Sequence, residues 1–293
     1  MAKNKTKPHS GAVARREVAR RQQAALRAQQ RRRLIISWLI GVVIIGLIVA
    51  GITIVVLHVK AGEQTLAFDG PKNVQQISPP NATGDGLAIV ANPDVKLVDD
   101  AITVDVHVDY QSRDALNAMQ FYGQALSSLA NDGKIRLLYH LHIAQDDVYN
   151  NTSGGRAVEA ATCADTVGAF TPYLLAAFMA APLTPSAGTV GFTDAQLKTD
   201  FAATAGITGD DLTRFLTCYS SRATSAFVKA MDAGNQIAAI PGNSTYASGV
   251  TTTPVFLANN IEVDITTDMF SATTAPKDAD GLLTLLQKTV GTT

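Results

Sequence analysis

Cysteine is scarce in this sequence, which has only two, Cys163 and Cys218, among its 293 residues. They stand 55 positions apart, so the chain contains no Cys-x-x-Cys pair of the kind that carries out thiol–disulfide exchange. The sequence also lacks a glycine-rich phosphate loop, a Gly-x-Ser-x-Gly elbow and a His-Glu-x-x-His zinc motif. It therefore offers no motif for phosphate binding, serine hydrolysis or zinc-dependent proteolysis.

Charged residues are absent from one long apolar segment, Leu34 to Leu57. As an α-helix its 24 residues would extend about 36 Å, enough to cross a hydrocarbon core of roughly 30 Å. Trp38 lies near one end, as an interfacial aromatic residue would. A cleaved signal peptide is the alternative, but the segment is too long and no clear small-x-small cleavage site follows it. We therefore predict a transmembrane signal anchor over residues 34–59.

Acidic residues are nearly missing from the N-terminal tail. Residues 1–33 hold eleven Lys or Arg and one acid, Glu17, whereas the rest of the chain holds 13 basic and 24 acidic residues. The positive-inside rule places this tail in the cytoplasm and the C-terminal part outside, which predicts a single-pass protein of the cell membrane. The tail is either a juxtamembrane helix on anionic lipid or a disordered segment that only sets orientation. No folded basic surface accompanies it, so we expect the lipid bilayer as a partner and no nucleic acid.

Hydrophobic periodicity divides the remaining chain. Turn-forming residues dominate 60–94, which we predict to be an extracytoplasmic linker with one short strand at Leu87 to Val90. The folded domain is predicted over 95–293. Its first part alternates at Ile102 to Val108, has helical spacing from Ser112 to Leu129 and alternates again from Lys134 to Ile143. This pattern predicts a strand, a crossover helix and a second strand parallel to the first.

The second part of the domain is predicted to be mainly helical over about 154–240. Strands are predicted at Val255 to Leu257 and Ile261 to Ile265, and a last helix at about Asp278 to Val290. These patterns alone indicate the α/β class with a helical insertion.

Two segments carry a family resemblance. Residues Ile102 to Leu116 read ITVDVHVDYQSRDAL, a strand that runs into a helix start, and residues Gly249 to Asn260 read GVTTTPVFLANN. Together they resemble the DsbA-type thioredoxin-fold thiol–disulfide oxidoreductases, in which an Asp-aromatic-x lead precedes Cys-x-x-Cys and a cis-proline loop faces the cysteines. The resemblance covers roughly Val95 to Gly291. It implies a thioredoxin-like fold with an inserted helical domain, preceded here by one transmembrane helix.

The resemblance points to an emptied catalytic motif. The four motif positions hold Ser112, Arg113, Asp114 and Ala115, so both cysteines are missing. A serine hydroxyl forms no disulfide and an alanine resolves none, so the resemblance implies a redox enzyme's scaffold without its chemistry.

Further roles come from the resemblance alone. The expected binding groove lies between the helix start, with Tyr110, Ser112 and Arg113, and the loop of Thr253 and Pro254, whose peptide bond would be cis. Some DsbA-like proteins carry a second, structural disulfide in the helical insertion, and Cys163 and Cys218 look like that pair. An extracytoplasmic location permits such a bridge.

Ser112 also has a simpler interpretation. As an N-cap it would satisfy amides of the first helical turn, and Asp114 would be favourable near the positive helix end. The sharper alternative is that Ser112 and these amides hold a peptide or an anion.

Four polar residues, His107, Asp109, His140 and His142, could lie on neighbouring strands. Histidine and carboxylate suit zinc, but the spacing matches no recognised metal motif. We expect satisfied polar groups at this place, no metal and no other cofactor.

Three functions stay open. The first is a redox-inactive binding or chaperone-like module for extended segments of exported or envelope proteins, which uses backbone pairing beside the proline loop. The second is a thiol–disulfide oxidoreductase that uses Cys163 and Cys218. The third is a structural protein that assembles with other envelope proteins through its helical face.

Overall fold

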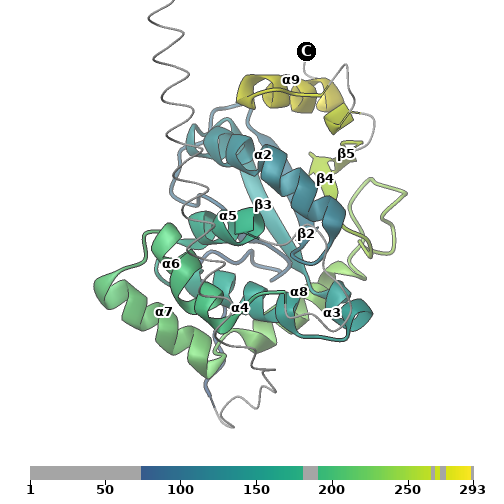
Figure 1. Cartoon of the computed structure of the whole chain (residues 1–293). Coiled ribbons are helices and arrows are strands. Elements are labelled where there is room, and N and C mark those ends of the chain that lie inside the picture. The colour runs from purple at the N-terminus through teal and green to yellow at the C-terminus, as the bar shows by residue number, and fades with distance from the viewer. Residues whose placement is uncertain (1–73, 181–190, 265–267, 271–274, 292–293) are drawn as a thin grey trace, which may run out of the picture. The chain divides into compact units, whose positions relative to one another are not determined.

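The computed structural model describes residues 74–180, 191–264, 268–270 and 275–291 (Figure 1). All of them belong to one compact unit, Leu66–Thr293. The predicted cytoplasmic tail 1–33, the predicted anchor 34–59 and residues 60–73 of the predicted linker lie outside the described residues. Within the described ranges, no helix combines the length and the apolar character needed to cross a bilayer.

A five-stranded mixed sheet forms the centre of the described part, in the order β1-β3-β2-β4-β5. The strands are β1 Ile89–Val90, β2 Ile102–Asp109, β3 Ile135–His142, β4 Val255–Ala258 and β5 Ile261–Glu262. The pair β2 and β3 is parallel, as the strand–helix–strand pattern predicts, and the other pairs are antiparallel. The strand β5 ends before Val263 and Asp264 and is thus shorter than predicted, while Ile265 of that prediction lies outside the described residues.

The alternation of β2 explains the two faces of the sheet. Ile102, Val104, Val106 and Val108 are buried on one face, against helix α2, Arg113–Asn131. The residues between them are Thr103, Asp105, His107 and Asp109, which the strand's period of two places on the other face. The sheet therefore has one apolar and one partly polar interior face.

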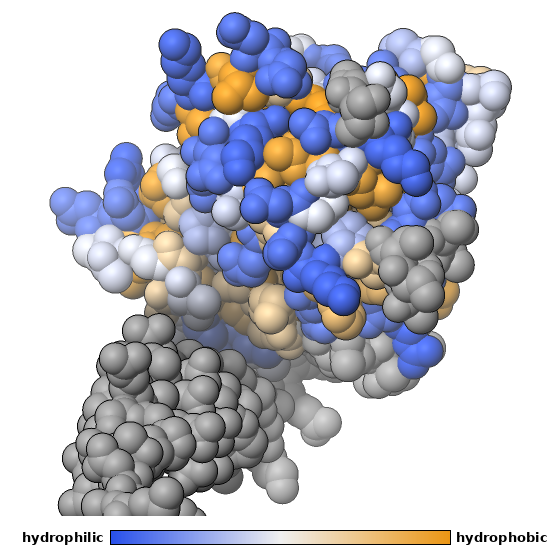
Figure 2. Space-filling view, turned by 90° about the horizontal axis from the view of Figure 1, so that it is seen from above, coloured by the Kyte–Doolittle hydropathy of each residue, from blue (hydrophilic) through white to orange (hydrophobic). Residues whose placement is uncertain are grey.

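Helices cover both faces (Figure 1). On the apolar side, α2 lies beside α9, Ala279–Val290, which buries Leu282 and Leu286. Figure 2 looks onto this side and shows apolar side chains in separate patches among hydrophilic ones. The remaining helical elements are α3 Ala144–Tyr149, α4 Ser153–Asp165, α5 Phe170–Ala180, the π-helical turn η1 Gln196–Asp200, α6 Phe201–Thr204, α7 Gly209–Ser221 and α8 Ser225–Asn235.

The predicted linker is wrong for the described residues 74–94, which are part of the folded domain. The strand β1 pairs antiparallel with β3, and Ile89 is completely buried. Farther upstream, the Asn81 side chain and main chain both donate hydrogen bonds of 2.8 Å to the Asp165 carboxylate. A strand of two residues is too short for periodicity to mark a domain boundary, and turn formers around it suggested a spacer.

Gly249 fixes the approach to β4. Its φ is +93°, and an added Cβ would lie 2.4 Å from the carbonyl carbon of Gln236, just after α8. The next amide, of Val250, donates a 2.8 Å hydrogen bond to the carbonyl of Asn235. The loop before β4 therefore packs against the end of α8, at a distance that only glycine permits.

We predict that Gly249→Ala destabilises the protein more than Gly242→Ala. Gly242 has a similar φ, +77°, but nothing within 4 Å of an added Cβ, so it isolates the conformational cost of about 1–2 kcal/mol. At Gly249 a backbone clash adds about 1–3 kcal/mol. Urea denaturation of both variants measures the difference. Equal losses would show that the loop shifts freely on α8.

Candidate functional site

Ser112 links the start of α2 to the proline loop. Its Oγ accepts a hydrogen bond from the Ala115 amide at 3.3 Å and donates one to the Thr253 carbonyl at 3.0 Å. The φ of −80° and ψ of 119° are those of an N-cap residue. The predicted cap therefore forms, and the same hydroxyl also holds the second motif of the site.

The proline loop lies beside the end of β2 because of the register of β4. Val255 pairs with His107 in the antiparallel ladder, which brings the preceding residues next to the strand end that leads into Ser112. The Thr253-Pro254 peptide bond is cis. Thus the structure brings together Ser112, Thr253 and Pro254, as the resemblance implied. Ala115, in the first turn of α2, is completely buried.

The main chain before the cis bond is open to pairing. Among the described residues, the amides of Thr251, Thr252 and Thr253 have no hydrogen-bond partner. Thr251 and Thr252 are exposed, and Thr253 is half-buried. Exposed Arg113, the first residue of α2, follows Ser112 directly. We call residues Thr251–Thr253 the proline-loop edge.

Tyr110 does not belong to this site, which corrects the prediction from the family motif. Its side chain is 2 % exposed and lies in the core, with ring centroids 4.3 Å from Phe178 and 5.9 Å from Phe192. The strand β2 ends one residue earlier, at Asp109, and the side chain of Tyr110 points into the core before α2 begins. Tyr110 joins the sheet to α5 and has no surface to offer a ligand.

Buried acids beneath the motif were not assigned to the site by the sequence. Asp109 accepts hydrogen bonds from the amides of Gln111 at 2.9 Å and Gln145 at 3.0 Å. Burial raises its pKa to about 7, against the opposing effect of these two bonds. Asp109 therefore ties the motif loop to the start of α3.

A second buried acid connects the motif loop to the helical insertion through hydrogen bonds. Asp146 accepts from the amides of Gly154 at 2.7 Å and Gly155 at 2.8 Å, in the first turn of α4, and from the side chain of Gln111. Burial raises the pKa of Asp146 to about 6. Gln111 in turn accepts from Asn151 at 2.9 Å. No sequence motif identifies these residues as a group, because they come into contact only when α3 packs on the sheet.

The histidines form a buried cluster on the polar face of the sheet. His107 and His142 face each other, with 3.1 Å between Nδ1 and Nε2, and His107 stacks on His140 at 4.0 Å between centroids. Burial first, and His140 second, lower the pKa of His107 well below its ordinary value and that of His142 to about 4. Within the described ranges, no three His, Cys, Asp or Glu side chains are arranged to hold a metal ion.

Cys163 and Cys218 form a disulfide that joins α4 to α7 in the helical insertion. Cys163 is completely buried and Cys218 is 7 % exposed. Each cysteine lies in the last turns of its helix, where the negative end of the helix dipole disfavours a thiolate. The position suits a structural bridge and is unlike that of the Ser112 helix start.

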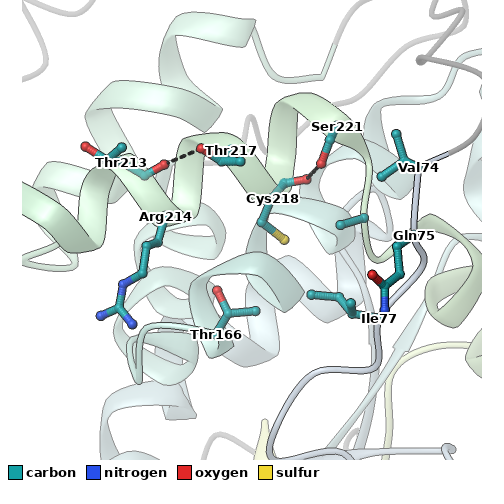
Figure 3. A pocket seen from close by; sticks show the side chains of 10 residues that line it. Val74, Gln75, Ile77, Thr166, Thr213, Arg214, Thr217, Cys218 and Ser221 are labelled. Carbon is teal, nitrogen blue, oxygen red and sulfur yellow. Dashed lines mark hydrogen bonds between the residues drawn. The ribbon is translucent and has the colours of Figure 1, made fainter.

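A surface pocket of about 390 Å³ lies beside Cys218, between α7 and residues 74–77 (Figure 3). The hydroxyls of Thr166, Thr213, Thr217 and Ser221 each donate to a main-chain carbonyl. The pocket therefore presents mainly apolar atoms and contains none of the motif residues.

We predict that the double variant Cys163→Ala, Cys218→Ala loses about 4 kcal/mol of stability, from the entropy of closing a 55-residue loop. Denaturant unfolding of the oxidised wild type and the variant measures the loss, and wild type unfolded in reductant is the matched control. A loss below about 1 kcal/mol would contradict a structural role for the bridge.

Comparison with known proteins places the fold. No protein-family model matches the chain, and no curated protein is similar enough to match. The chain is similar to the reduced disulfide bond oxidoreductase DsbG of Mycobacterium tuberculosis, with 19% identity, 71% of this chain and 89% of that chain covered, and a TM-score of 0.51.

It is also similar to MdbA, a thiol–disulfide oxidoreductase of Actinomyces oris, with 16% identity, 75% and 96% covered, and a TM-score of 0.55. At this identity the likeness concerns the fold. The chain therefore has the DsbA-like thioredoxin fold, and Ser112, Arg113, Asp114 and Ala115 lie at the start of α2, directly after the turn that follows β2.

Proposed function

We propose that this chain is a membrane-anchored, extracytoplasmic and redox-inactive DsbA-like protein that binds extended segments of exported polypeptides. The observation that carries the proposal is the proline-loop edge. Three successive amides that have no hydrogen-bond partner within the described ranges lie beside the start of α2, on a loop that Ser112 and the end of α8 both hold by hydrogen bonds.

The chemistry of the motif supports a role without redox turnover. The Ser112 hydroxyl already makes two hydrogen bonds, and none of the side chains that the structure describes is a basic partner for it. Ala115 has no reactive group, and the two cysteines of the chain are joined to each other. Neither a nucleophilic thiolate nor a resolving thiol is present at the helix start.

The backbone of the edge supports strand addition as the mode of binding. An extended peptide would place its carbonyls against the amides of Thr251 and Thr253, with little demand on its own sequence. The edge is preorganised, because Ser112 holds one end and α8 holds the other through Val250. Preorganisation lowers the entropy lost on binding.

The location is part of the same proposal. The uncharged segment Leu34 to Leu57 follows a basic tail, so the positive-inside rule puts the domain on the outer side of the membrane. Polypeptides that emerge there unfolded present free strand-forming backbone. They are the partner class that an exposed edge of this kind would receive.

We predict that Thr251→Pro weakens binding of reduced, carboxymethylated α-lactalbumin, an unfolded probe without free thiols, roughly three- to tenfold. Proline removes one backbone donor, and a backbone hydrogen bond contributes about 0.5–1.5 kcal/mol. Fluorescence anisotropy at constant pH and salt concentration measures the dissociation constant. Circular dichroism checks that the variant is folded.

The matched control is Thr251→Val, which keeps the backbone amide and the side-chain shape but removes the hydroxyl. It should bind like the wild type. Equal binding by all three proteins, or an equal loss in the valine variant, would contradict strand addition at this edge.

The enzyme alternative is a disulfide oxidoreductase that uses Cys163 and Cys218. The pocket beside Cys218 favours access to the bridge, but the helix C-termini on which both cysteines lie do not favour a thiolate. Insulin reduction that disappears in Cys163→Ala would establish this alternative and displace the binding role.

A further inference from the structure

The two sulfurs of the disulfide have different surroundings. Cys163 on α4 is completely buried, whereas Cys218 on α7 is 7 % exposed and lines the surface pocket of about 390 Å³. Figure 3 shows the Cys218 sulfur pointing from α7 into the space between Thr166 and Ile77. The residues that line the pocket do not include Cys163. The pocket therefore leads from solution to one end of the bridge.

The size and lining of the pocket suit a small molecule. Its volume falls in the range of pockets that bind small ligands, about 300–1,000 Å³. Val74, Ile77 and Ala223 contribute apolar side chains, and Gln75 and Arg214 contribute polar ones. A thiol of low molecular mass, with an aliphatic stem and polar ends, matches both the space and this mixture of groups.

The buried sulfur has a hydrogen-bond donor beside it. The Thr224 hydroxyl lies 3.7 Å from Cys163 Sγ, and because a disulfide sulfur has no hydrogen, the hydroxyl is the donor. Thr224 is completely buried, and its oxygen accepts a 2.7 Å hydrogen bond from the Thr162 hydroxyl. A hydrogen bond to a charged group favours its charged form. Thr224 therefore makes Cys163 the better leaving group of the two.

We propose that Cys218 is a site of reversible modification by small-molecule thiols, which enter the pocket and open the bridge from this side. The attacking thiolate forms a new S–S bond with Cys218 Sγ, and the bond between Cys218 and Cys163 breaks. The electron pair of the broken bond leaves with Cys163, beside the Thr224 hydroxyl. The products are a mixed disulfide on Cys218 and a thiolate on Cys163, so the thiol is the sole co-reactant.

The thiolate that attacks in this step comes from solution. Both cysteines lie near helix C-termini, which disfavour a thiolate on the protein but do not hinder attack by an external one. The step modifies the chain itself and requires no polypeptide substrate. It is therefore independent of the proposed function, and it also differs from turnover by a disulfide oxidoreductase.

Other contacts join the same helices and remain when the bridge is open. Glu159 on α4 is 2 % exposed and accepts hydrogen bonds from Nε and Nη2 of Arg222, the residue that ends α7. The Nε to Oε2 distance is 3.0 Å. Breaking a buried ion pair is costly, so these contacts hold Cys163 near Cys218. The Cys163 thiolate can then attack the mixed disulfide, which releases the small thiol and restores the bridge.

The test uses the full-length, oxidised protein in detergent at neutral pH, with reduced glutathione as the probe. Acid stops the exchange at successive times, the chain is denatured, and free thiols are alkylated with N-ethylmaleimide. The sequence contains no third cysteine, so peptide mass spectrometry assigns each label to Cys163 or Cys218. We expect glutathione on Cys218 and N-ethylmaleimide on Cys163 in the first product.

Two tryptophan variants test whether the thiol enters through the pocket. Thr217 and Ser220 are both exposed on α7, and of these two Thr217 lines the pocket. We expect Thr217→Trp to open the bridge more slowly than Ser220→Trp, by about fivefold or more, because the indole occupies the space of the thiol. Circular dichroism checks that both variants are folded.

Three results would overturn the proposal. They are glutathione mainly on Cys163, equal opening rates in the two tryptophan variants, and a native bridge that stays closed for about a day, beyond the usual time of disulfide exchange. The first and third are read from the wild type, so a variant that fails to fold does not rescue the idea. Removal of free glutathione tests reversibility. The singly modified fraction should re-form the bridge without an added oxidant, and a stable adduct would contradict the proposal.

Discussion

The hydrogen bond from Ser112 to the Thr253 carbonyl is the contact on which the site depends. It joins two segments 141 positions apart, and the same oxygen caps the first turn of α2. A cysteine in this place would present a weak donor that is suited to exchange chemistry. A serine hydroxyl is a better hydrogen-bond donor and takes no part in thiol–disulfide exchange. The serine therefore fixes the junction between the start of α2 and the proline loop, and in the proposed function the neighbouring amides are the groups available to a ligand.

Beneath this junction lies a layer of buried polar side chains, which is costly unless every group has a partner. Asp109 and Asp146 each accept two backbone amides, and their raised pKa values reflect the remaining cost of burial. These bonds join the motif loop to α3 and α4. The layer thereby positions the helical insertion against the thioredoxin-like part, and His140 with Asn235 extends the same connection to α8.

Much of the fold could be predicted from periodicity, because β2, α2 and β3 are local patterns whose apolar faces meet in one core. The cap at Ser112 followed from the preference of serine for the start of a helix, and the contact with the proline loop followed from the family resemblance. The short strand β1 lies within the strand predicted at Leu87 to Val90, but its pairing with β3 and the inward turn of Tyr110 could not be predicted, since neither depends on a local repeat. The pairs Gln111 with Asp146 and His140 with Asn235 are separated by 35 and 95 positions, so only the packed structure reveals them. The three amides of the proline-loop edge, which have no partner in the part of the chain that the structure describes, are a property of the main chain, and side-chain patterns do not describe it.

We propose that the end of the fold formed by the start of α2 and the proline loop is a binding edge. The most direct measurement is a titration of the 15N-labelled, oxidised protein with carboxymethylated α-lactalbumin, followed by amide chemical shifts. The account predicts saturable shifts at Ser112, Arg113 and Thr251–Thr253. Shifts centred on α7 and the pocket beside Cys218, or no saturable shifts at all, would contradict it.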